Sequence, residues 1–192
     1  MMSEKIMIVD DEPITRMDIR EILEGSGYDV VGEGRNSEEA IEKAYYLKPD
    51  LIIMDVKMPK VNGIKTSSVI RGFSDCAILL LTAYSHHELI EQAKDAEING
   101  YLVKPVSERE LLPAVEMILS ERSRFKALQK EIFRLNQKME ERKIIERAKG
   151  ILMQQLSCSE YDAYRSMQKH SMATHIPLAK LAEQIIIDYK SK

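Results

Sequence analysis

The sequence predicts an α/β protein in which a doubly wound, five-stranded parallel sheet is followed by a long coiled-coil helix and a small three-helix bundle. Over the first 120 residues, five short apolar runs alternate with segments of helical periodicity. The runs are apolar at consecutive positions, which is typical of parallel strands that helices cover on both faces. After residue 120 the helical periodicity continues, and the sheet is therefore expected to be confined to residues 1–120.

The predicted strands and helices alternate along this first part of the chain. The strands are the apolar runs at residues 5–10, 28–33, 50–55, 77–83 and 100–104. The helices are expected where apolar residues recur three or four positions apart, at 13–27, 36–48, 62–73, 85–97 and 107–120. Asn36 and Ser85 are predicted N-caps, and Gly25 or Gly27 is expected to end the first helix. Right-handed crossovers then place helices on both faces of the sheet.

Polar side chains stand at the ends of four predicted strands. Asp10 and Asp11 follow the first strand. Asp55, Thr82 and Lys104 end the third, fourth and fifth strands. Because ligands of such sheets bind beyond the carboxyl ends of the strands, these five groups are expected to converge. Each residue alone has an ordinary explanation, such as helix capping by Asp11, but their joint occurrence favours a site.

The chemistry that suits these groups is phosphoryl transfer. Three carboxylates can bind a hard divalent cation such as Mg²⁺, and a hydroxyl and an ammonium remain to contact phosphoryl oxygens. Asp55 is the candidate phosphoacceptor, because it ends the central predicted strand and the turn-rich segment VKMPKVNG follows it. His86 and His87 are expected at the exposed start of a helix and take no part in this chemistry.

Charge distinguishes the two parts of the chain. Residues 1–120 hold 22 acidic and 13 basic side chains, whereas residues 121–192 hold 9 acidic and 15 basic. An acidic first part suits a cation site, and a basic second part suits a polyanion or an acidic protein surface. No apolar run approaches the roughly 20 residues of a membrane span. No secretory signal is recognisable, and Cys76 and Cys158 lack metal-type spacing, so a cytoplasmic protein is expected.

Four motifs in the first part resemble the receiver domain of two-component response regulators: VDDEP, DVKMPKVNG, LLTA and YLVKP. The resemblance covers about residues 4–120 and implies a flavodoxin-like receiver, assigned to residues 1–120. It implies that a sensor histidine kinase phosphorylates Asp55. It also implies that Mg²⁺ binds Asp11 and Asp55 directly and Asp10 through water. The backbone carbonyl of Lys57 would complete the protein ligands.

The same resemblance assigns three residues to the response that follows phosphorylation. Thr82 would hydrogen-bond one phosphoryl oxygen, and Lys104 would pair with another. Tyr101 would be the aromatic switch, whose ring rotates inward when the threonine shifts. Apart from slow hydrolysis of the acyl phosphate, no enzymatic activity is expected.

A long helix is predicted to leave the receiver. Apolar residues repeat every seven positions, with two more between them, namely Ile118, Phe125, Leu128, Ile132, Leu135 and Met139. This heptad stripe predicts a coiled coil between two copies of the chain, with residues 121–141 as a linker helix. The alternative is a single amphipathic helix that folds onto its own domain.

The C-terminal residues 142–192 are predicted to form three helices. The first continues the linker helix, the second is capped by Ser157 or Ser159, and Pro177 opens the third. Basic residues recur in this segment with Tyr161 and Tyr164 among them, a pattern that suits phosphate contacts and base stacking.

This segment is similar to the ANTAR module, the antitermination output domain of certain response regulators, through the run AKGILM and a second and third helix. The resemblance implies binding to structured RNA hairpins and transcription antitermination by a phosphorylated dimer. Where the family commonly has Leu-Arg, this chain has Met167 and Gln168. The candidate RNA contacts are Arg147, Lys149, Tyr164, Arg165, Lys169 and Lys180.

Two other outputs remain open at this stage. The run PLAKLAEQIII resembles the first helix of a helix-turn-helix, and a DNA-binding factor would need a recognition helix after it. The other alternative is a helical bundle that docks on an acidic protein. In either case, phosphorylation of Asp55 is expected to shift the population between two states of the chain.

Overall fold

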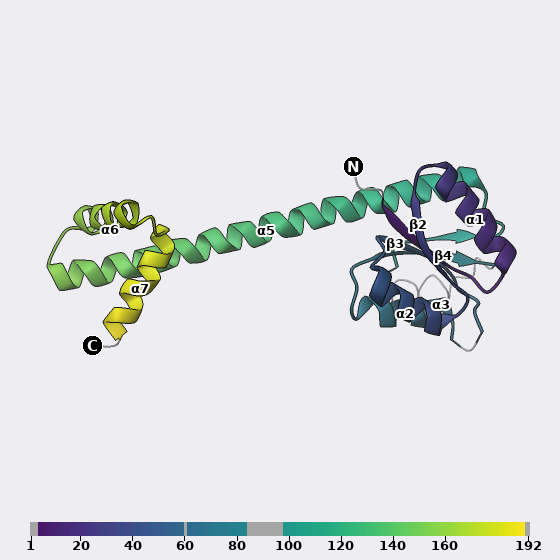
Figure 1. Ribbon diagram of the computed structural model, residues 1–192, viewed down its shortest axis with the longest axis horizontal. Helices are drawn as coiled ribbons and strands as arrows, with labels where there is room; N and C mark the ends of the chain where they lie inside the picture. Colours follow the sequence, from purple (N-terminus) through teal and green to yellow (C-terminus); the bar gives the residue numbers. More distant parts are fainter. Residues whose placement is uncertain (1–3, 60, 84–97, 191–192) are drawn as a thin grey trace. The chain divides into compact units, whose positions relative to one another are not determined.

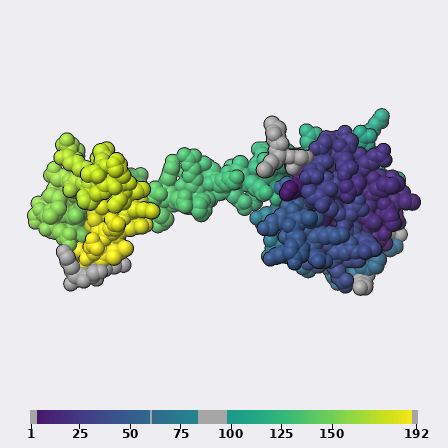
Figure 2. All heavy atoms as spheres, in the orientation of Figure 1, coloured from purple at the N-terminus to yellow at the C-terminus, as the bar shows by residue number. Residues whose placement is uncertain are grey.

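The computed structural model describes residues 4–59, 61–83 and 98–190. The chain divides into two compact units, Met1–Phe125 and Lys126–Lys192. In the space-filling view, the strands and helices of the first unit form one compact body (Figure 2). No helix among the described residues has the length and apolar character needed to cross a membrane.

The first unit contains the predicted five-stranded sheet. The strands are β1 (Lys5–Val9), β2 (Asp29–Gly34), β3 (Leu51–Asp55), β4 (Ala77–Thr82) and β5 (Gly100–Val103). All neighbouring pairs are parallel, and the strand order is β2-β1-β3-β4-β5. The prediction of a doubly wound parallel sheet is therefore confirmed, with β3 at its centre.

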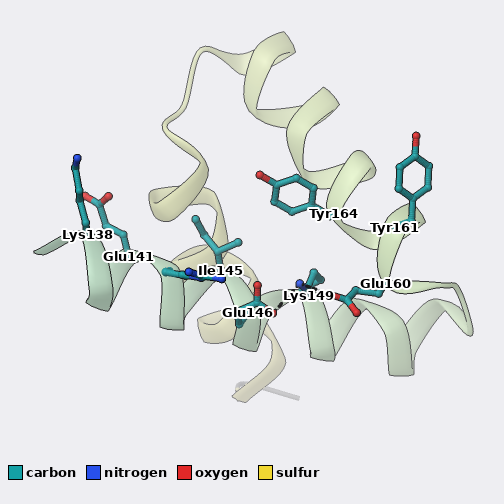
Figure 3. A pocket seen from close by; sticks show the side chains of 9 residues that line it. Lys138, Glu141, Ile145, Glu146, Lys149, Glu160, Tyr161 and Tyr164 are labelled. Atoms are coloured by element: carbon teal, nitrogen blue, oxygen red, sulfur yellow. Dashed lines mark hydrogen bonds and ion pairs between the residues drawn. The ribbon is translucent and has the colours of Figure 1, made fainter. Parts of the chain in front are cut away.

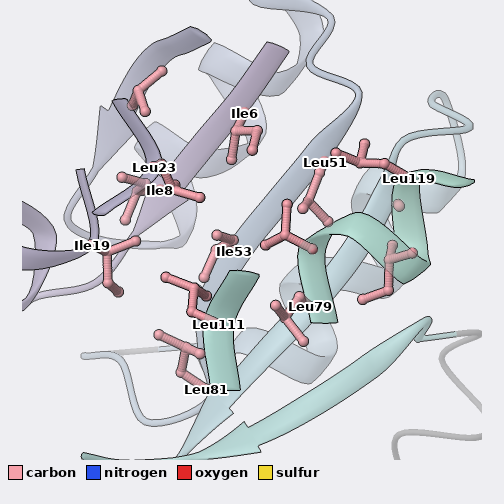
Figure 4. Packing of buried hydrophobic residues seen from close by; sticks show 14 residues of the cluster. Ile6, Ile8, Ile19, Leu23, Leu51, Ile53, Leu79, Leu81, Leu111 and Leu119 are labelled. Atoms are coloured by element: carbon pink, nitrogen blue, oxygen red, sulfur yellow. The ribbon is translucent and has the colours of Figure 1, made fainter. Parts of the chain in front are cut away.

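Helices cover both faces of this sheet. Three of them are α1 (Pro13–Gly25), α2 (Ser37–Leu47) and α3 (Gly63–Arg71), and the longer α5 spans Glu108–Leu156. Alternate residues of β1 face opposite layers, so that Ile6 and Ile8 pack with α1 and the first turns of α5 (Figure 4). Met7 and Val9 pack on the other face with α2 and α3, which lie side by side (Figure 1).

Local sequence explains where these helices begin and end. Pro13 is the first residue of α1, and the helix ends at Gly25, one of the two glycines expected there. Asn36 caps α2 as predicted, because its side chain accepts a hydrogen bond from the Glu39 amide. The predicted cap at Ser85, the helix at 85–97, and His86 and His87 lie outside the described residues.

The helix α5 continues from Glu108 to Leu156, which confirms the prediction that a long helix leaves the receiver. Its first turns lie in the core of the first unit. Ile118, which the heptad pattern placed on the dimer stripe, is only 3% exposed there. The prediction that Ile118 belongs to the dimer stripe was wrong, because at this end of α5 the apolar face of the helix packs in the core of its own unit. The exposed stripe begins at Phe125, which is 62% exposed.

The second unit is the predicted three-helix bundle. The end of α5 packs with α6 (Glu160–Thr174) and α7 (Leu178–Lys190). Ser159 caps α6 by accepting a hydrogen bond from the Asp162 amide, and α7 begins just after Pro177. Met167 is 2% exposed and lies in the core with Leu181. Met167 stands where the ANTAR family commonly has leucine, so this difference keeps an apolar side chain in the core.

Candidate functional site

Three carboxylates gather at the carboxyl ends of β1 and β3. Asp10 is fully buried, Asp55 is 4% exposed, and Asp11 is exposed. One oxygen from each lies within 4.8 Å of the others. The strand pairing produces this arrangement, since Val9 is aligned with Met54 and the next residues are the aspartates. The structure thus brings together the three acids that the sequence predicted to converge.

Lys104 provides the positive charge that faces these acids. Its Nζ lies 2.7 Å from Asp10 Oδ2 and 3.3 Å from Asp55 Oδ1. Burial lowers the pKa of Lys104, but its hydrogen bond and ion pairs with the two aspartates outweigh burial and raise that pKa. The ammonium is therefore charged at neutral pH and bridges two buried carboxylates.

Burial has the opposite consequence for the phosphoacceptor candidate. It raises the pKa of Asp55, the nearby Asp10 charge adds to this increase, and Lys104 opposes both. A backbone hydrogen bond from Lys57 also favours the charged carboxylate. The Asp55 carboxylate is thus held in a site that disfavours its own negative charge and attracts positive charge.

The backbone around the acids is tightly organised. Asp10 Oδ1 accepts a hydrogen bond of 2.9 Å from the Glu12 amide, and Arg16 donates to the Asp10 carbonyl at 2.7 Å. A Cβ at Gly63 would overlap the backbone carbonyl of Asp55, so only glycine fits where α3 begins. The Gly63 amide donates to the Val56 carbonyl at 2.9 Å and closes the turn after β3.

The remaining predicted receiver residues lie on neighbouring strands. Thr82 ends β4 and is 6% exposed, and its carbonyl accepts a 2.8 Å hydrogen bond from the Lys104 amide. Tyr101 lies on β5 next to Leu80 of β4, and 46% of it is exposed. Lys57 contacts Asp55 through its backbone amide. Their roles in phosphorylation stay predictions.

This donor set fits Mg²⁺. Carboxylate oxygens are the ligands that a hard divalent cation prefers, and Mg²⁺ sites commonly use one or two carboxylates with waters and phosphate oxygens. The oxygens of Asp10, Asp11 and Asp55 are close enough to share one ion. The exposed Asp11 leaves the solvent side of the cluster accessible to water and to a phosphoryl group.

In the second unit, the predicted RNA contacts differ in exposure and in their neighbours. Lys149 is 7% exposed, and its Nζ lies 2.6 Å from carboxylate oxygens of both Glu146 and Glu160. Arg147 lines a separate hollow with residues of α7. Arg165, Lys169 and Lys180 are exposed. Burial and ion pairing thus make Lys149 a link between α5 and α6.

A hollow of about 730 Å³ lies between the end of α5 and the start of α6 (Figure 3). It contains three of the residues singled out in the sequence, Lys149, Tyr161 and Tyr164. The lining also includes Lys138 and Arg142, which the sequence reasoning did not select. Positions 138, 142, 145 and 149 are spaced four, three and four apart and so share one helix face. This regular spacing was the signal in the sequence that could have identified Lys138 and Arg142.

Comparisons with known proteins identify two family matches in this chain. The response regulator receiver domain matches residues 6–116, and the ANTAR domain matches residues 134–186. The transcriptional regulatory protein PdtaR of Mycobacterium tuberculosis is 40% identical over 182 residues, which cover 95% of this chain and 89% of PdtaR. The response regulator protein VraR of Staphylococcus aureus is 28% identical over 183 residues, covering 88% of this chain and 87% of VraR.

Solved structures match the first unit. The receiver domain of a modulated diguanylate cyclase from Desulfovibrio desulfuricans aligns with a TM-score of 0.59 and 30% identity. The alignment covers 63% of this chain and 97% of the cyclase receiver domain. A LuxR-family response regulator from Aurantimonas aligns with a TM-score of 0.60 and 34% identity, covering 62% of this chain and 87% of that one.

Proposed function

The chain belongs to the response regulators that join a receiver domain to an ANTAR domain, and we propose that it accepts a phosphoryl group on Asp55 and binds RNA hairpins to cause transcription antitermination. The observation that supports phosphorylation most directly is the buried cluster in which Lys104 bridges Asp10 and Asp55 beside Asp11. The family matches support the RNA output.

In the proposed transfer, an Asp55 carboxylate oxygen attacks the phosphorus of a phosphohistidine on a sensor histidine kinase. The new P–O bond forms as the P–N bond breaks, and the kinase imidazole leaves with the electron pair. A Mg²⁺ ion held directly by Asp11, Asp55 and the Lys57 carbonyl, and through water by Asp10, would supply positive charge to the phosphoryl oxygens. The chain is a phosphoacceptor rather than an enzyme, and its acyl phosphate hydrolyses slowly.

The switch follows from the added charge. A phosphoryl group on Asp55 brings between one and two negative charges and strong acceptor oxygens. Lys104, which already lies 3.3 Å from Asp55, pairs with one oxygen. The Thr82 hydroxyl moves toward another, and Tyr101, now 46% exposed, rotates into the space that the threonine leaves. The population then shifts toward the active state.

We propose a homodimer through the exposed stripe on α5. Five apolar side chains at heptad positions are at least half exposed, namely Phe125, Leu128, Ile132, Leu135 and Met139. A second copy of the same helix would cover them with the same spacing. Leu128→Glu is expected to give monomers in sedimentation equilibrium. Phe133→Glu, at a 65% exposed position off the stripe, should leave dimers intact. Dimers that survive Leu128→Glu would exclude this interface.

The RNA output is tested by binding to a tandem-hairpin RNA with and without a small phosphodonor and Mg²⁺. Affinity is expected to rise on phosphorylation, and Asp55→Ala should abolish this rise. Asp29→Ala, at an exposed position of β2, is the matched control and should behave like the unaltered chain. A DNA duplex of equal charge should bind more weakly. Preference for the duplex would favour a DNA-binding output, and binding to neither would reassign the basic unit to a protein partner.

A further inference from the structure

The hollow between α5 and α6 combines two features of a site for one unstacked base, namely an aromatic ring and free cationic groups. Its volume of about 730 Å³ lies within the range of small-ligand sites, roughly 300–1,000 Å³. All of its lining residues belong to the second unit. Its floor includes the half-buried Ile145 of α5, and its opposite wall is the start of α6 (Figure 3).

The aromatic wall is formed by two tyrosines of α6. Tyr164 points into the hollow, 38% of it is exposed, and its ring centroid lies 6.0 Å from Lys149 Nζ (Figure 3). Tyr161 is 67% exposed, and the guanidinium carbon of Arg165 lies 5.8 Å from its ring centroid. Both rings have a cationic neighbour, and Tyr164 is the one that points into the hollow, so it offers the ring that a base would stack on.

The charged residues that line the hollow form two groups, one whose members pair with each other and one that is exposed to solvent. Glu146 and Glu160 both lie 2.6 Å from Lys149, so two acids and one cation satisfy one another. Lys138 and Arg142 are exposed, and no ion pair within the described part of the chain involves either of them. Even with Glu141 beside them, this end of the hollow carries net positive charge.

We propose that this hollow receives one splayed-out base of an RNA loop, stacked on Tyr164, with the flanking phosphates at Lys138 and Arg142. Proteins read single-stranded loops in this way, by stacking bases on aromatic rings and pairing phosphates with basic side chains. The hollow is lined by both kinds of group. This inference rests on the proposed RNA output and names its binding site.

The test uses the full-length phosphorylated chain and a pool of tandem hairpins with randomised loops, from which binding RNAs are selected. Each loop nucleotide of one selected RNA is then replaced by an abasic one. At a single position, the abasic change should weaken binding to the unaltered chain by roughly 5- to 150-fold, the span of one stacked base. In Tyr164→Leu the same change should cost less than about 2-fold, because the stacking partner is already gone.

Controls separate stacking from folding. Tyr164→Phe keeps the ring and should retain affinity, and Tyr189→Leu alters a tyrosine of α7 that is 45% exposed and outside the hollow. In case Tyr164→Leu fails to fold, Lys138→Gln and Arg142→Gln test the phosphate contacts at exposed positions. Each should lower the salt dependence of log K by about one phosphate contact. Lys130→Gln, which lies outside the lining, should lower it less.

Failure of this inference is distinct from failure of the proposed function. If the unaltered chain retains no RNA from the pool, the RNA output itself is wrong. If RNA binds but every abasic change costs the same in Tyr164→Leu as in the unaltered chain, the hollow does not hold a base. Unchanged salt dependence in both the Lys138 and Arg142 variants would likewise remove the phosphate contacts.

Discussion

Replacement of Lys104 by methionine tests the electrostatics of the acidic site. Lys104→Met keeps the length of the side chain and removes the only ammonium that bridges Asp10 and Asp55 among the described residues. The lysine side chain is 20% exposed, and those of the two aspartates are 0% and 6% exposed. Two buried carboxylates would then face each other and Asp11 without a counter-charge.

The cost follows from burial. Removing one partner of a buried ion pair destabilises a protein by about 3–5 kcal/mol, and the partial exposure of Lys104 places this case near the lower end. For a unit of this size, each kcal/mol lowers Tm by about 3–5 °C. Lys104→Met is therefore expected to melt about 10–15 °C below the unaltered chain in the absence of Mg²⁺.

Addition of Mg²⁺ should reverse much of this loss. In the unaltered chain the ammonium lies 2.7 Å from Asp10 Oδ2 and would compete with the proposed Mg²⁺ ion for this carboxylate. Without that competitor the ion binds more tightly, and each tenfold gain in affinity adds about 1.4 kcal/mol to the stabilisation at saturating Mg²⁺. The increase in Tm on adding Mg²⁺ should thus be larger in Lys104→Met.

Thermal melts monitored by circular dichroism, with EDTA and with Mg²⁺, measure both quantities. Lys43→Met is the matched control, because Lys43 pairs with Glu39 at the surface and its side chain is 40% exposed. That variant should change stability by at most about 1 kcal/mol and leave the Mg²⁺ response as it was. Equal Mg²⁺ responses in Lys104→Met and the unaltered chain would refute competition for the carboxylates.

Four further predictions concern other parts of the chain. Gly63→Ala should destabilise by about 1–3 kcal/mol, because its Cβ would overlap the last carbonyl of β3. Gly150→Ala, where a Cβ meets nothing within 4 Å, should stabilise α5 by about 0.5–1 kcal/mol, and urea denaturation measures both. Burial raises the pKa of the Glu33 carboxyl, but hydrogen bonds from two arginines of α1 outweigh burial and lower that pKa. The charged carboxylate therefore stabilises the fold at pH values above the ordinary pKa of glutamate. This stabilisation is lost as the pH falls through the lowered pKa of the folded state. Glu33→Gln should cost about 1 kcal/mol at pH 7 and nothing below the lowered pKa, as denaturation at several pH values would show. Lys149→Met should speed hydrogen exchange in the first turns of α6, whereas Lys169→Met should not.

The receiver site was predictable from sequence because topology fixes it. In a parallel sheet with crossover helices, the carboxyl ends of neighbouring strands share one edge, so Asp10, Asp55 and Lys104 had to approach one another once the strands were recognised. Their exact partners depend on register. That Lys104 contacts both aspartates follows from the pairing of β5 with β4, which no local pattern encodes.

Helical patterns in the sequence did not predict what an apolar or charged side chain contacts in the folded chain. The heptad spacing groups Ile118 with Phe125, although one is buried in the receiver core and the other is exposed. The sequence predicts Lys149 as an RNA contact, and in the folded chain it pairs with Glu160 of α6, a partner that no helical pattern indicates. Periodicity specifies a face of a helix, and only the packing of other elements decides what that face contacts.

Arg142 shows how the proposed dimer and the proposed base site can share one helix. The positions that follow Leu128 and Leu135 at seven-residue intervals include Arg142, so the apolar stripe ends there with a charged residue. A coiled coil extended past Met139 would bury this guanidinium against its copy, which costs free energy without a partner carboxylate. The same residue lines the hollow, where exposure to solvent lets it contact a phosphate. We therefore expect the charge at that heptad position to end the proposed dimer interface at Met139 and to leave Arg142 open to solvent.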